Sequence, residues 1–252
     1  MAKTKEKHSA LTNSLAAYDN QVVFDDKPLP LKPCNYGIFG RKGSGKTNLF
    51  LNLISRKESP WYKLFNLVFL ISPTADRDDK LADLLEDIGE DQYYKTLSNE
   101  TLTDIIDKID THTEEFKAKK RNRGKKPAYM IVYDDVIHDL VRKKDTRLIC
   151  MLATQNRHRH ITNVYLLQKY NTYLPTVVRS NLDCISYYNT GNKGELEAFV
   201  KEQNQDEEAL TAMYRFATSE PYSFLHINMY SPKARFYKRF DEIAYKPNND
   251  EE

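Results

Sequence analysis

The feature that most restricts the fold of this chain is a glycine-rich turn between an apolar segment and a segment with helical apolar spacing. Residues 36–54 read YGIFGRKGSGKTNLFLNLI. Gly40 to Thr47 fit the pattern G-x-x-x-x-G-K-[ST], whose context is a strand before the loop and a helix after it. Glycines let backbone N–H groups approach an anion, and the helix presents its positive N-terminal end to the same anion. The sequence therefore predicts a site for the phosphates of a nucleotide.

Each residue of this loop has an expected role. Lys46 would reach the β- and γ-phosphates, and Thr47 would offer its hydroxyl to Mg²⁺. The other ATP-binding residues, which we expect to contribute through the loop amides, are Gly40, Arg41, Lys42, Gly43, Ser44 and Gly45. ATP and Mg²⁺ are the predicted cofactors.

Apolar runs of strand length alternate with helical patterns along the chain. The runs lie at 36–40, 65–72, 128–135, 163–168, 182–188 and 223–230. Several are apolar at nearly every position, as in parallel strands buried on both faces. Two intervening segments, 78–88 and 98–109, carry Leu and Ile on one helical face, and Ser98 is the expected N-cap of the second. The alternation predicts an α/β fold with a mainly parallel central sheet flanked by helices.

Two carboxylates close the third run, AYMIVYDD. The C-terminal ends of strands line the nucleotide crevice in such sheets. Asp134 is expected to hold Mg²⁺ together with Thr47, and Asp135 to orient the attacking water or act as its base. The alternative for Asp135 is that it caps the following helix. The sequence contains no guanine-reading N-K-x-D pattern, so the acid pair favours ATP hydrolysis over a GTP switch.

The fourth run ends in a polar residue, Gln168, at the same edge of the predicted sheet. We expect Gln168 to sense the γ-phosphate or position water; a purely structural glutamine is the alternative. Arg157, Arg159 and Arg179 stand around this run. An arginine finger supplies positive charge to a phosphoryl group in a neighbouring subunit, and we expect Arg157 or Arg179 to be that finger. Each arginine taken alone could equally be a surface or ion-paired residue.

Four segments together resemble the FtsK–HerA superfamily of ring-forming, DNA-pumping ATPases. The likeness is greatest to the genome-packaging ATPases of poxviruses, other large DNA viruses and virophages. The segments are GRKGSGKT, VFLISPT (68–74), IVYDD (131–135) and residues 156–183, and they cover about residues 35–190. The last segment is the most specific, with Arg157-His158, Gln168, Pro175 and Arg179-Ser-Asn181 in the order of the family. It departs at Asn156, where relatives often have glycine.

The resemblance implies a RecA-like P-loop NTPase fold of the ASCE class, with the glutamine strand inserted between the phosphate-loop strand and the strand that carries Asp134. It also implies a homo-oligomeric ring with ATP at subunit interfaces and double-stranded DNA in the central channel. The expected function is ATP-driven packaging of a viral genome into its capsid. Capsid or portal-vertex proteins are the further expected partners, and the virion or a viral factory in the host cytoplasm is the expected location.

Three other functions stay open at this point. A cellular HerA-like translocase or helicase shares all of these motifs, although it usually carries an additional β-rich domain. A small-molecule P-loop kinase would need a lid with clustered arginines and a second substrate pocket, and Gln168 and the paired aspartates argue against it. A nucleotide-binding structural subunit without turnover is the third.

Charge is strongly segregated, although the net charge of the 252 residues is only +2. From Asp76 to Glu115 there are fourteen acidic and four basic residues, a net charge of −10, whereas residues 116–126 carry seven basic residues and no acid. Contacts of such a segment with phosphates would give salt-dependent DNA binding. The candidate contacts are Lys117, Lys119, Lys120, Arg121, Arg123, Lys125 and Lys126. A solvated loop, or a partner for the acidic helices upstream, is the alternative.

The remaining features concern organisation and compartment. We expect a flexible arm (1–30), one ATPase domain (31–235) and a C-terminal tail (236–252). No apolar run approaches the roughly 20 residues that span a bilayer, so no membrane contact is predicted. The N-terminus lacks the apolar core of a secretory signal. Cys34, Cys150 and Cys184 are far apart without metal-ligand spacing and are expected to be reduced thiols inside a cell.

Overall fold

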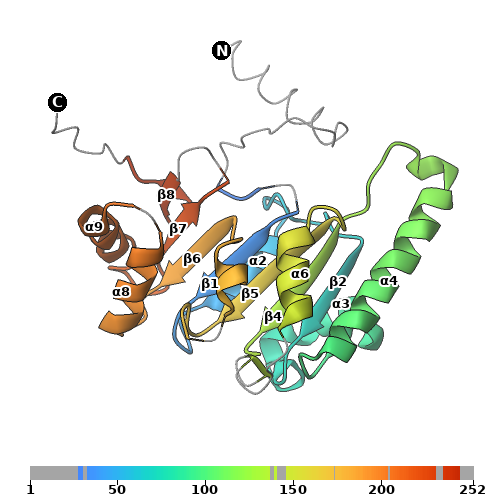
Figure 1. The fold of residues 1–252 in the computed structure, drawn as a ribbon, viewed down its shortest axis with the longest axis horizontal. Helices are drawn as coiled ribbons and strands as arrows, with labels where there is room; N and C mark the ends of the chain where they lie inside the picture. The colour runs from blue at the N-terminus through green and yellow to red at the C-terminus, as the bar shows by residue number, and fades with distance from the viewer. Residues whose placement is uncertain are drawn as a thin grey trace, which may run out of the picture.

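The computed structural model describes residues 28–30, 33–136, 139–140, 146–172, 174–203, 205–230 and 235–244. The strands of these residues form one sheet in the order β3-β2-β4-β5-β1-β6-β7-β8-β9, with helices on both faces (Figure 1). Most of the predicted arm (1–27, 31 and 32) and the end of the predicted tail (245–252) lie outside the described residues.

All six predicted strand runs form strands. Their bounds are Asn35–Phe39 (β1), Leu67–Ile71 (β2), Tyr129–Asp134 (β4), Ile161–Leu167 (β5), Cys184–Tyr188 (β6) and Phe224–Asn228 (β7). The first five run parallel, and β7 pairs antiparallel with β6. Every residue of β1, β4, β5, β6 and β7 is buried, which explains why these strands read as continuous apolar runs.

Strand β5 lies between β1 and β4, as the resemblance implies. The backbone N–H of Gly40 donates to Leu167 O (3.2 Å), and that of Asp135 donates to Leu166 O (3.1 Å). The sheet hydrogen bonds therefore continue into the first residues beyond β1 and β4. The phosphate loop, the acid pair and Gln168 consequently emerge side by side from three adjacent strands.

Helices cover the two faces of the sheet over two separate apolar cores. One core includes buried residues of α4 (Asn99–Ala118), α6 (Arg147–Gln155), α8 (Lys193–Glu202) and α9 (Glu207–Ala217). The other includes α2 (Lys46–Ser55) and α3 (Ala82–Ile88), which lie behind the sheet in Figure 1. The short helix α7 (Thr176–Arg179) precedes β6. This arrangement is the predicted α/β fold with helices on both faces.

Short 3₁₀ turns connect several of these elements. They lie at Ala75–Arg77, Asp79–Leu81, Glu90–Gln92 and Lys120–Asn122. The predicted helix at 78–88 is therefore divided into a 3₁₀ turn and α3. The carboxylate of Asp78 accepts from Lys80 N and caps the first piece, so the local capping bond sets a tighter start than the apolar spacing indicated.

Helix α4 begins where predicted and ends later than predicted. The hydroxyl of Ser98 accepts from Thr101 N (2.9 Å), so Ser98 is the N-cap. The helix continues nine residues beyond the apolar stripe that ends at Ile109. Its later turns contact the sheet through polar atoms: His112 Nδ1 and Thr113 Oγ1 lie 3.0 and 2.7 Å from the hydroxyl of Tyr129. An apolar pattern cannot register such contacts.

Three short strands complete the sheet at its two edges. They are β3 (Tyr93–Tyr94) beside β2, and β8 (Arg235–Lys238) and β9 (Asp241–Glu242) beyond β7. Phe236 and Tyr237 of β8 are buried. Residues just past the predicted boundary at 235 thus add to the sheet of the ATPase domain, and the division into arm, domain and tail stays a prediction. In the described part of the chain, no helix is long and apolar enough to cross a membrane.

Candidate nucleotide-binding site

The loop between β1 and α2 needs its glycines for two different reasons. Gly43 and Gly45 have φ values of 76° and 101°, in the left-handed region that side chains disfavour. Gly40 is constrained by space instead, since a Cβ there would lie 2.6 Å from Tyr188 Cβ and 2.8 Å from Ser44 Oγ. The loop therefore approaches β6 as closely as backbone can.

Lys46 opens α2 and lies over the loop. Its ammonium donates to Gly40 O (2.7 Å) and Arg41 O (3.2 Å). Burial lowers the pKa of Lys46, and the nearby carboxylates of Asp135 and Asp134 act in the opposite direction. The lysine thus lies close enough to both acids to interact with them, as the sequence predicts for a phosphate-binding lysine beside a metal-holding acid.

Asp134 ends β4 in a buried position, with only 9% of its surface exposed. Burial raises its pKa to about 6, while the hydrogen bond from Ser72 and the charge of Lys46 act to lower it. The Ser72 hydroxyl donates to Asp134 Oδ2 at 2.9 Å. Burying a carboxylate with so few donors is unfavourable unless a positive group joins it.

Asp135 and Gln168 meet directly across two neighbouring strands. Gln168 Nε2 donates to Asp135 Oδ1 at 2.9 Å. Asp135 has a left-handed φ of 50°, a strained conformation for a residue other than glycine. The turn ends the extended course of β4, and its side chain meets the amide of Gln168.

Sequence reasoning did not single out Ser72, although it lies within the quoted segment VFLISPT. It directly follows β2, whose C-terminal end lies beside that of β4. A polar residue ending an apolar run at the same sheet edge as Asp134 was the available signal. A second polar atom, the Ser44 hydroxyl in the loop, is buried and has no hydrogen-bond partner in the described part of the chain. Buried polar atoms are nearly always paired, so this one is suited to a ligand.

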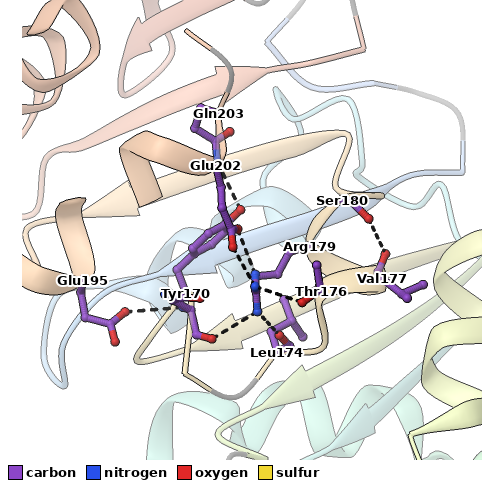
Figure 2. A network of polar contacts seen from close by, with 10 residues as sticks. Tyr170, Leu174, Thr176, Val177, Arg179, Ser180, Glu195, Glu202 and Gln203 are labelled. Carbon is purple, nitrogen blue, oxygen red and sulfur yellow. Dashed lines mark hydrogen bonds and ion pairs between the residues drawn. The ribbon is translucent and has the colours of Figure 1, made fainter. Parts of the chain in front are cut away.

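Arg179 is held entirely by its own chain (Figure 2). Its guanidinium forms a bidentate pair with Glu202, with Nε–Oε2 at 3.0 Å and Nη2–Oε1 at 2.7 Å. The other N–H groups donate to Thr176 Oγ1 and to the carbonyls of Asn171 and Leu174. An arginine has five N–H donors, and these five contacts match that number. The side chain is only 10% exposed.

Arg157 and Arg159 lie at the opposite end of the sheet, just before β5 begins. Arg157 Nη2 pairs with Asp183 Oδ1 at 3.1 Å, and 61% of its side chain is exposed. Arg159 Nη1 pairs with Asp110 at 2.6 Å. The structure therefore does not bring Arg157 to the crevice of its own chain. A finger acts on a neighbouring subunit, so this position is compatible with that role.

The basic segment also lies away from the phosphate loop. It runs from the last turn of α4 to the start of β4, at the end of the sheet opposite the C-terminal ends of the strands (Figure 1). All seven of its Lys and Arg residues are exposed. As predicted, the segment is separate from the nucleotide site.

Strand order, more than the loop alone, decides the class of protein. With β5 between the phosphate-loop strand and the acidic strand, the chain has the fold of P-loop NTPases of the ASCE class. The family model described as Poxvirus A32 protein matches residues 21–216. The chain belongs to this family.

Solved structures of viral proteins have the same fold. The genome packaging NTPase B204 from Sulfolobus turreted icosahedral virus 2, in complex with AMPPCP, has a TM-score of 0.56 and 18% identity, covering 83% of this chain and 98% of that one. B204 from Sulfolobus turreted icosahedral virus, described as the DNA-packaging ATPase, has a TM-score of 0.52 and 19% identity, covering 82% of this chain and 98% of that one.

A bacterial secretion protein shares the fold as well. The cytoplasmic domain of the type VII secretion ATPase EccC from Thermomonospora curvata has a TM-score of 0.53 and 14% identity, covering 89% of this chain and 28% of that one. No curated protein matches the chain. The fold alone therefore occurs in proteins of different function, and the argument for function must come from the family and the site.

Proposed function

We propose that this protein is a Mg²⁺-dependent ATPase motor that moves double-stranded DNA into a viral capsid. The observation that carries the proposal is the convergence of Lys46, the acid pair and Gln168 at one sheet edge of a Poxvirus A32 family member. B204, which shares the fold, is described as a genome packaging NTPase and has been solved with AMPPCP and with ATP-γ-S.

The loop supplies the phosphate-binding groups. Its amides and the Lys46 ammonium bind the β- and γ-phosphates, and the unpaired Ser44 hydroxyl adds a donor. Lys46 exchanges its bonds with the loop carbonyls for phosphate oxygens. Because Arg41 and Lys42 are exposed, we assign their contribution to the backbone.

The oxygen donors beside the loop fit Mg²⁺. Thr47 offers a hydroxyl and Asp134 a carboxylate, which are the hard ligands that this ion prefers. Bound there, Mg²⁺ neutralises charge on the transferring phosphoryl group. In the described residues, no group of three His, Cys, Asp or Glu side chains could hold a metal. The site would accordingly rely on phosphate oxygens and water as further ligands, as Mg²⁺ sites commonly do.

Asp135 and Gln168 act on the water. The Asp135 carboxylate orients the attacking water and accepts its proton, while the bond from Gln168 fixes the carboxylate. Gln168 can respond to the γ-phosphate through the same amide. Since Arg179 holds the carbonyls of Asn171 and Leu174, the segment after Gln168 has a fixed anchor.

Between the two predicted fingers, the structure favours Arg157. Arg179 would have to give up five contacts within its own chain to reach a neighbour. Arg157 is exposed and has a single ion pair with Asp183, so a neighbouring nucleotide could recruit it at lower cost. This role requires a homo-oligomer, and we propose a ring with ATP at its subunit interfaces.

DNA contact is assigned to the seven basic residues of 117–126, which are exposed and distant from the nucleotide. Neutralised phosphates release counterions, so such contacts make affinity fall steeply with salt. Capsid or portal-vertex proteins are the further proposed partners. The proposed location is the virion or a viral factory in the host cytoplasm.

The test is steady-state ATP hydrolysis with and without linear duplex DNA, with Lys46→Ala as the control. Stimulation by duplex that the mutation abolishes is the expected result. Turnover that ignores DNA but requires an added nucleoside would contradict the motor and favour a small-molecule kinase.

The DNA contact has its own matched test. Changing Lys117, Lys119 and Lys120 to Gln is compared with changing Arg56, Lys57 and Lys63 to Gln, which removes the same charge from other exposed positions. The first variant should weaken duplex binding and flatten its salt dependence by up to about three contacts, at a slope of about 0.9 each. Equal effects of the two variants would contradict a specific contact.

A further inference from the structure

Tyr222 is an exposed aromatic residue that the account so far leaves unused. It lies in the turn between α9 and β7, and 71% of its surface is exposed. Its φ of 59° is in the left-handed region, where a bulky side chain is unfavourable. Neither the exposed ring nor the strained backbone helps the fold, and such strain is concentrated at functional positions.

The ring borders the phosphate loop. A Cβ at Gly45, the residue before Lys46, would lie 3.5 Å from Tyr222 Cδ1 and 3.8 Å from the hydroxyl of Tyr188. Tyr188 follows the same side of the loop, since its hydroxyl lies 3.5 Å from Gly45 O. The loop therefore has an aromatic wall on the side of β6 and β7.

The opposite side of the loop is of different chemical character. On the side of β4 and β5 it faces Asp134, Asp135 and Gln168, which are suited to the metal and the attacking water. The chemistry at the γ-phosphate therefore occupies one side. The ribose and base, which follow the α-phosphate at the other end of the nucleotide, are left with the aromatic side.

The turn that carries Tyr222 is fixed in advance. Glu220 pairs with Lys238 Nζ (2.6 Å) and Arg239 Nη2 (3.4 Å), and its carbonyl accepts from Ser223 N (3.2 Å). Arg239 N donates to Phe224 O at 2.9 Å. These bonds attach both ends of the turn to β8 and the turn after it. A ligand that meets the ring would not have to order the turn first, which favours binding.

We propose that Tyr222 is the platform on which the base of the bound nucleotide stacks. The inference rests on the proposed function, because it requires nucleotide phosphates in the Gly40–Thr47 loop. The ligand class is a nucleoside di- or triphosphate. Every base has a π-face, so stacking tolerates different bases, and Tyr222 contributes affinity without selecting adenine over guanine.

The test is calorimetric titration of Mg²⁺-ADP, Mg²⁺-GDP and inorganic tripolyphosphate into the full chain. Tyr222→Gly removes the ring and suits a left-handed backbone, so the turn keeps its shape. Tyr222→Phe keeps the stacking surface. Phe216→Ala is the control, because Phe216 in α9 is another exposed aromatic residue, with 56% of its surface exposed.

Tyr222→Gly should weaken ADP and GDP binding by a similar factor, about tenfold or more, and leave tripolyphosphate binding unchanged. Tyr222→Phe and Phe216→Ala should bind all three ligands as the wild type does. Unchanged ADP affinity in Tyr222→Gly would overturn the inference, and so would an equal loss of tripolyphosphate binding. Wild-type protein that binds tripolyphosphate but not ADP would overturn it alone, whereas failure to bind either would overturn the proposed function with it.

Discussion

The two ends of the central sheet both bury polar side chains, but only one end satisfies them within the chain. At the N-terminal end, Asn35 Nδ2 donates to Ala153 O (2.7 Å) and Asn181 O (2.8 Å), and its Oδ1 accepts from Asn163 Nδ2 (2.8 Å). Its backbone N–H donates to Asp183. We call Asn35, Asn163 and Asp183 the N-terminal network.

The C-terminal end has buried polar groups with fewer partners. Asp134 has a pKa raised to about 6, Lys46 has a lowered pKa, and the Ser44 hydroxyl has no partner in the described residues. Both ends are positioned by the same strands, β1, β4 and β5. The difference indicates that polar groups at one end stabilise the fold, whereas those at the other are arranged for a charged ligand.

The largest expected effect is that of Lys46→Ala on catalysis. The mutation removes a positive group from the phosphates, and a single lost donor at such a site costs about a hundredfold or more in rate. Stability should change little, since the Lys46 ammonium contacts only loop carbonyls. Steady-state hydrolysis and thermal unfolding check the two parts. Activity above a tenth of the wild-type value would contradict the assignment.

Asp134→Asn should separate catalysis from stability. Burial raises the Asp134 pKa from 3.8 to about 6, so ionisation at neutral pH destabilises the fold by about 3 kcal/mol. Below about pH 4 both folded and unfolded forms are protonated. The penalty grows between about pH 4 and 6 and is constant above. The mutant should therefore gain stability over the wild type as pH rises through this window, while hydrolysis is lost.

Urea unfolding at pH 4, 5 and 7 measures this gain, with Asp135→Asn as the matched control. A stability difference between Asp134→Asn and wild type that does not depend on pH would contradict the buried charge.

Asn35→Ala should have the reverse outcome at the other end of the sheet. It leaves the Asn163 amide and two carbonyls without a partner, and the expected loss in free energy of unfolding is about 2 to 4 kcal/mol. The kcat of the folded fraction should stay within about twofold. A double-mutant cycle with Asn163→Ala should be non-additive, since the two share a bond. Additive losses would argue against a network.

The smallest expected effect belongs to the Arg179–Glu202 pair. If Arg179 anchors the segment after Gln168, Glu202→Gln should lower kcat a few-fold and match Arg179→Lys, with KM for ATP little changed. If Arg179 were a finger, Glu202→Gln would leave kcat unaffected. Mutating Glu195, which accepts from Thr172 Oγ1 at 2.7 Å in the same segment, gives a third comparison.

The sequence predicts one end of the sheet well. The buried strands read as continuous apolar runs, and each site residue emerges from the end of such a run, so Lys46, Asp134, Asp135 and Gln168 could be placed together. The insertion of β5 between β1 and β4 came from family resemblance, because strand order leaves no trace in periodicity.

Features that depend on tertiary contacts could not be predicted. The N-terminal network joins Asn35 to residues more than a hundred positions away. The later turns of α4 have no apolar stripe, and β8 and β9 are too short to give a pattern. The exposed ring of Tyr222 reads like any tyrosine in a turn, since its place beside Gly45 results from the fold alone.

The central claim, that one end of the sheet binds Mg²⁺-nucleotide and the other holds the fold, is tested most directly by thermal unfolding with and without Mg²⁺-ATPγS. At a ligand concentration a hundred times Kd, binding contributes about 2.7 kcal/mol, or roughly 5 to 10 °C for a chain of this size. Wild type should show this shift, Asn35→Ala the same shift from a lower starting Tm, and Lys46→Ala a normal Tm with no shift. A full shift in Lys46→Ala, or none in the wild type, would contradict the account.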